Sequence, residues 1–77
     1  MNLLKKLLKE NPGLRAEISR VESMDVRVID RASEGKKVNH SNAFKIYAFL
    51  VDRNFFAIEN VKLPDLFSET EETKNIT

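Results

Sequence analysis

The sequence predicts a small α+β domain, in which an N-terminal helical pair precedes a three-stranded antiparallel sheet (order ααβββ). Leucines recur at helical spacing near the N-terminus, valines alternate with charged residues after residue 24, and residues 43–63 are rich in aromatic and β-branched side chains. At 77 residues and without cysteine, the chain forms one domain at most and has no disulfide to reinforce a small core.

Two helices are expected first. The apolar residues of the first one lie on a single arc: Leu3, Leu4, Leu7 and Leu8. Asn11, Pro12 and Gly13 end it, because proline biases the preceding residue away from the helical conformation. The same tripeptide can begin a second helix over about residues 12–22, with Asn11 as its N-cap and Pro12 in its first turn.

A half-buried strand is expected next. In the segment MDVRVIDRA, Val26 and Val28 share one face of a strand, and Arg27 and Arg31 share the other. Ile29 interrupts this alternation. Residues 33–42 are polar and contain a glycine, which predicts a loop that is longer than most connections.

The aromatic-rich stretch predicts a strand hairpin. As one helix, its apolar residues would point in every direction, which suits only an enclosed helix. As strands, residues 43–51 and 55–63 pair around a turn at residues 52–54. A helix over residues 42–53 remains the alternative. Pro64 is expected to end the last strand, and residues 68–77 to form a disordered, acidic-leaning tail after a compact domain of residues 1–67.

Groups that could carry out catalysis or bind a metal are scarce. The chain has no cysteine, one histidine, and neither a glycine-rich phosphate loop nor an acidic metal-binding loop. His40 and Ser41 are adjacent on the expected polar loop, but no third group is placed to orient them. We therefore expect a protein that is not an enzyme and holds no cofactor and no metal ion.

A two-sided apolar hairpin in so short a chain predicts a protein interface. The helical pair can cover one face of the sheet, and nothing else in the chain covers the other. Surplus apolar surface is typical of interaction sites. We expect a small regulator, adaptor or inhibitor that occludes a larger protein partner, or a homodimer formed across the sheet; such stand-alone domains are common on phages and other mobile elements. The expected interface residues are Tyr47, Phe49, Phe55, Phe56, Leu66 and Phe67.

A short motif near the end of the domain also suggests partner binding. Asp65, Leu66 and Phe67 resemble the end of the short peptides that dock on bacterial sliding clamps. The glutamine that leads such peptides is absent here, and Leu63 takes its place. The alternative is that Leu66 and Phe67 fold back onto the core.

The distribution of charge supports a second class of function. Residues 1–38 hold nine Lys and Arg against six Asp and Glu, whereas residues 39–77 hold four against six. A regulator that binds nucleic acid would use this basic first half, because contacts to phosphates dominate such affinity. The residues expected to form its site are Lys36, Lys37, His40, Arg27 and Arg31.

The sequence favours a cytoplasmic protein that does not enter a membrane. Charged residues interrupt the N-terminal leucines, so they do not form the apolar run of a secretory signal. No stretch approaches the roughly 18 apolar residues of a membrane-spanning helix.

Overall fold

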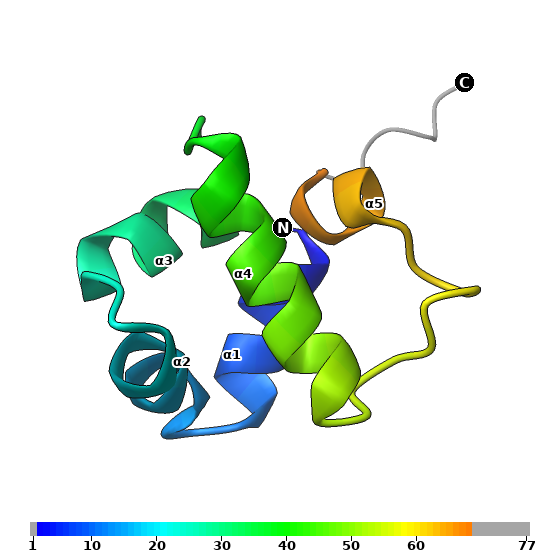
Figure 1. Ribbon diagram of the computed structural model, residues 1–77, viewed down its shortest axis with the longest axis horizontal. Helices are drawn as coiled ribbons and strands as arrows, with labels where there is room; N and C mark the ends of the chain where they lie inside the picture. The colour runs from blue at the N-terminus through cyan, green and yellow to red at the C-terminus, as the bar shows by residue number, and fades with distance from the viewer. Residues whose placement is uncertain (1, 69–77) are drawn as a thin grey trace.

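The computed structural model describes residues 2–68, and these fold as a bundle of helices (Figure 1). In chain order the helices are α1 (Leu3–Glu10), α2 (Leu14–Glu22), α3 (Val26–Ser33), α4 (His40–Asp52) and α5 (Leu63–Phe67). The predicted α+β class is wrong, because residues 2–68 contain no strand. The two N-terminal helices are confirmed, and the predicted tail lies outside the described residues except for Ser68.

Helix α1 is anchored by the residue that precedes it. The Oδ1 atom of Asn2 accepts a hydrogen bond from the backbone N–H of Lys5 at 2.9 Å, which caps the helix. The Nδ2 atom donates to the carbonyl of Ala32 in α3 at 2.9 Å and to that of Phe67 in α5 at 3.1 Å. The side chain of Asn2 therefore joins the start of α1 to the ends of two other helices, and it is fully buried there.

The break between α1 and α2 lies at the predicted tripeptide, residues 11–13, but the N-cap of α2 is Gly13 and not Asn11. Asn11 closes α1 by donating its backbone N–H to the carbonyl of Leu7 at 3.0 Å. Gly13, at φ +94°, is the N-cap of α2, so the second helix starts two residues later than predicted. That positive φ is a conformation that glycine adopts without the steric cost of a Cβ atom.

Residues 26–33 form a helix and not the predicted strand. Asp25 caps it, since its Oδ1 atom accepts the backbone N–H of Arg27 at 2.9 Å. The fully buried side chain of α3 is Ile29, the residue that interrupts the alternating pattern. Ala32 lies three residues later on the same face and is also buried. A helical periodicity thus explains why Ile29 is apolar, which the alternation of a strand does not.

Helix α4 replaces the first strand of the predicted hairpin. Asn39 caps it at its N-terminus, and its buried side chains form one broad arc: Ile46, Tyr47, Phe49 and Leu50. This helix contacts α2, α3 and α5 and lies across the molecule in Figure 1. The helices on three sides cover the apolar side chains of α4, and Phe44 is the one large apolar side chain of this helix that stays exposed.

Residues 53–62 form turns rather than the predicted partner strand. The hydroxyl of Tyr47 donates to the carbonyl of Val61 at 2.6 Å, and the Tyr47 ring lies 5.6 Å from that of Phe56. These contacts hold the irregular segment against α4. Pro64 lies in the first turn of α5, where its missing N–H is not needed, so it does not end a strand.

Candidate functional site

The six residues predicted to bind a protein partner lie in or against the hydrophobic core: Tyr47, Phe49, Phe55, Phe56, Leu66 and Phe67. Three of them are buried: Tyr47, Phe49 and Leu66. The other three are half-buried against the same cluster. In residues 2–68 the apolar surface that motivated the protein-binding prediction is therefore mostly used by the fold itself.

Two helices joined by a tight turn form the most distinctive local unit. Helix α2 ends at Ser23, which has a left-handed conformation (φ 53°, ψ 48°), and α3 begins three residues later. The backbone N–H of Met24 donates to the carbonyl of Ser19 at 3.0 Å, and the Ser19 hydroxyl donates back to the carbonyl of Met24. The Met24 side chain is buried. These contacts fix a helix-turn-helix arrangement, in which α2 is viewed nearly along its axis and α3 across it (Figure 1).

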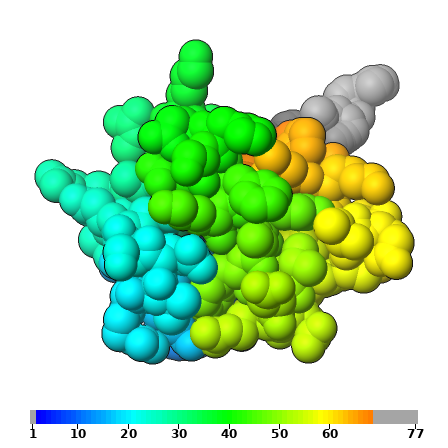
Figure 2. Space-filling view, in the orientation of Figure 1, coloured from blue at the N-terminus to red at the C-terminus, as the bar shows by residue number. Residues whose placement is uncertain are grey.

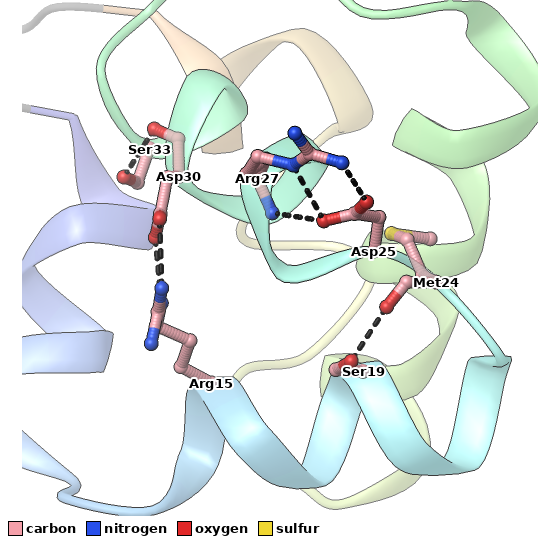
Figure 3. Close-up of polar contacts among 7 residues, drawn as sticks. All are labelled: Arg15, Ser19, Met24, Asp25, Arg27, Asp30 and Ser33. Atoms are coloured by element: carbon pink, nitrogen blue, oxygen red, sulfur yellow. Dashed lines mark hydrogen bonds and ion pairs between the residues drawn. The ribbon is translucent and has the colours of Figure 1, made fainter.

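An ion pair braces the two helices against each other. The Nε and Nη2 atoms of Arg15 in α2 donate to the two carboxylate oxygens of Asp30 in α3, at 2.6 and 2.8 Å (Figure 3). This hydrogen-bonded arginine lowers the pKa of Asp30 below its ordinary value. Both groups are partly solvated, so the pair adds little to stability. Its two-point geometry matches the relative orientation of α2 and α3 that their buried side chains set.

The outward face of α3 is basic. Arg27 and Arg31 are four residues apart, which places them on one side of the helix, and both are exposed. The Nη2 atom of Arg31 donates to the backbone carbonyl of Lys37 at 3.1 Å. Arg31 is therefore adjacent to the two lysines that follow α3, as the nucleic-acid alternative required.

The loop after α3 is held in place by its own backbone. Gly35, at φ +78°, follows the helix, and its N–H donates to the carbonyl of Ala32 at 3.1 Å. The N–H of Lys36 donates to the carbonyl of Arg31 at 2.9 Å, which completes a Schellman motif. The glycine that predicted a loop is thus the C-terminal stop of a helix. It places Lys36 and Lys37 at a defined position beside the end of α3.

Residues 26–37 carry four cations, of which two are ion-paired with neighbouring carboxylates. In the space-filling view, the segment from α3 to the start of α4 lies on the side away from residues 53–62 (Figure 2). Arg27 pairs with Asp25 at 2.8 Å and Lys36 with Glu34 at 3.3 Å, whereas neither Arg31 nor Lys37 is ion-paired with another described residue. His40 is exposed at the first position of α4. We call Arg27, Arg31, Lys36 and Lys37 the basic face.

Two open hollows lie away from the basic face. The larger, about 430 Å³, is formed between α1 and α5 and includes Asn2, Lys6 and Asp65 in its wall. The smaller, about 110 Å³, lies between α4 and residue Ile58. Residues 2–68 contain no cluster of side chains suited to bind a metal ion. Within the same range, no helix has the length and apolar character needed to cross a membrane.

Comparison of the chain with known protein families, with curated proteins and with solved structures finds no match. The basic face and the helix-turn-helix arrangement are therefore the features from which function is argued. The basic face consists of four of the five residues that the sequence predicts for a nucleic-acid site, and this prediction is not tested by the comparisons. The sequence did not predict the helix-turn-helix arrangement. A strand was expected over residues 24–32, so no helix was expected to follow the one at residues 12–22.

Proposed function

We propose that the protein binds duplex DNA with the α2–α3 unit, with α3 placed in the major groove. The observation that carries this proposal is the three-residue turn between α2 and α3, together with the exposed arginines on α3. In DNA-binding helix-turn-helix proteins, the second helix enters the major groove and the first crosses the backbone. The major groove of B-DNA is wide enough to admit an α-helix.

The residues around α3 supply contacts of the kind that such docking needs. Lys36 and Lys37 lie just past the C-terminal end of α3, where the N–H of Lys36 bonds to the carbonyl of Arg31, so they lie beside the groove when α3 is in it. Arg20 is exposed on α2, the helix that crosses the backbone. Lysine and arginine contacts to phosphate provide most of the affinity that does not depend on sequence.

The shape of the site favours DNA over double-stranded RNA. The major groove of A-form RNA is deep and narrow, and side chains cannot read it. A single exposed helix with arginines one turn apart, as on α3, suits the wider groove of B-DNA. A cytoplasmic location, which the lack of cysteine favours, belongs to this proposal.

The test is a salt titration of binding to a labelled duplex, followed by fluorescence anisotropy. Replacing Lys36 and Lys37 together by alanine should weaken binding to all duplexes and lower the slope of log affinity against log salt by about 2. The matched control is the pair Lys6→Ala and Lys62→Ala, on the α5 side of the molecule. If both double variants behave like the wild type, or if the wild type binds no duplex, the proposal fails.

Protein binding remains a second candidate, in the form of self-association. Its specific support is a pair of exposed apolar side chains beside the smaller hollow, Phe44 (53% exposed) and Ile58 (55% exposed). Proteins with a helix-turn-helix often bind two half-sites as symmetric dimers, and the hollow beside this patch includes no residue of the basic face. A dimer in sedimentation equilibrium that Phe44→Ser with Ile58→Ser converts to monomer supports it; a monomeric wild type contradicts it.

A further inference from the structure

Arg27 is exposed and is hydrogen-bonded at one edge of its guanidinium. Its Nε and Nη2 atoms donate to the two carboxylate oxygens of Asp25, at 3.2 and 2.8 Å. The side chain is nevertheless 83% exposed. Figure 3 shows that the third guanidinium nitrogen, Nη1, points away from the carboxylate. One edge of the guanidinium, formed by Nε and Nη2, is thus hydrogen-bonded to Asp25, and the adjacent edge, formed by Nη1 and Nη2, is left for other partners.

The free edge has a defined set of donors. A guanidinium has five N–H groups, and the Asp25 carboxylate takes one from Nε and one from Nη2. The three that remain belong to Nη1 and Nη2, and two of these point outward side by side. Such a pair matches the O6 and N7 acceptors that guanine presents in the major groove.

The position of Arg27 on α3 fits the same role. It is the second residue of the helix, and the N-terminal residues of a recognition helix are those that meet base edges. Arg31, one turn later, is engaged with the carbonyl of Lys37 and lies beside the lysines of the basic face. The two arginines of α3 therefore differ in surroundings and should differ in what they contact.

We propose that Arg27 reads a guanine in the major groove and that Asp25 orients the guanidinium for this contact. The proposal rests on the DNA-binding function above and adds the base that is recognised and the residue that recognises it. Arg31 then serves as a phosphate contact. A guanidinium already held in one orientation loses less freedom when it binds, so the carboxylate sharpens the choice of base.

The chemistry of Asp25 suits an orienting role. The hydrogen bond from Arg27 lowers the pKa of Asp25 from 3.8 to about 2, so the carboxylate keeps its charge further into the acidic range than an ordinary aspartate. The Oδ1 atom also caps α3 through the backbone N–H of Arg27. Asparagine caps helices about as well as aspartate. Asp25→Asn therefore removes the charged two-point contact and keeps the cap.

The experiment begins with selection of preferred sites by the full chain from a randomised duplex library. Binding is then measured by anisotropy for the selected duplex and for duplexes in which each guanine is replaced in turn, either by another base or by 7-deazaguanine, which lacks N7. The wild type should discriminate by roughly 5- to 150-fold at one guanine of each site. Arg27→Ala should abolish discrimination at that guanine alone, whereas Arg31→Ala should weaken binding to every duplex by a similar factor.

The Asp25→Asn variant tests whether Asp25 orients the Arg27 guanidinium or whether the positive charge of Arg27 is sufficient. It should lower discrimination at the same guanine by roughly 1.5- to 5-fold, with an unchanged melting temperature. Unchanged guanine preference in Arg27→Ala, or no guanine preference in the wild type, overturns the inference and leaves the DNA-binding function intact. Failure of the wild type to bind any duplex overturns both. Equal discrimination by Asp25→Asn and the wild type removes the orienting role from Asp25.

Discussion

At the scale of single residues, the side chains that organise this molecule carry weak sequence signals. Asn2 is an ordinary polar residue near an N-terminus, yet it is fully buried and makes three hydrogen bonds. Nothing in the local pattern indicates that its two amide hydrogens meet carbonyls 30 and 65 residues away. The basic face was easier, because Arg27 and Arg31 are four residues apart, and that spacing places them on one side of a strand and of a helix alike. The prediction that these two arginines share one side therefore did not depend on the type of element.

The role of Asn2 leads to a prediction about stability. Asn2→Ala removes a helix cap and leaves the carbonyls of Ala32 and Phe67 without the amide that they bond to. We expect the free energy of unfolding to fall by about 2–4 kcal/mol, measured by urea denaturation followed by circular dichroism.

Asn11→Ala provides a matched control for this change. Asn11 is half-buried at the other end of α1, and its side chain makes one local hydrogen bond, to the carbonyl of Leu7 at 2.8 Å. Its loss should cost about 1 kcal/mol. Equal losses for the two variants would show that Asn2 is no more than a cap.

At the scale of elements, the sequence was reliable where apolar periodicity and end signals agreed. Both hold for α1, where leucines at helical spacing precede the Asn-Pro-Gly break. They conflicted for α3, where two valines suggested alternation, while Asp25 and Ile29 fitted a capped helix. In a segment of only eight residues, a single apolar residue can decide between the alternation of a strand and the periodicity of a helix. Here that residue is Ile29. Helix α4 fell within the alternative left open for residues 42–53, apart from His40 and Ser41 at its start.

The turn between α2 and α3 could not be predicted for a similar reason. Ser23 adopts the left-handed conformation that glycine favours, and serine gives no sequence signal for it. Gly35, which does give such a signal, was assigned to a loop because the helix before it had been assigned as a strand. An error in one element thus removed the evidence for the arrangement on which the proposed function depends.

At the scale of the whole molecule, this short chain covers α4, a helix whose apolar side chains point in several directions. Helices α2, α3 and α5 contact α4, and the turns after it contribute Phe55 and Phe56 to the same cluster. This packing uses most of the aromatic surface. It leaves the basic face beside α3 exposed, and the DNA-binding proposal rests on that face.

The location of binding on the whole molecule tests this account most directly. The measurement is amide chemical-shift mapping of the isotopically labelled chain on addition of unlabelled duplex DNA. The account predicts that the largest shifts fall on α3 and residues 34–40, with smaller shifts on exposed parts of α2. Largest shifts around Phe44 and Ile58 or along α5, or no shifts with duplex in excess, would contradict it.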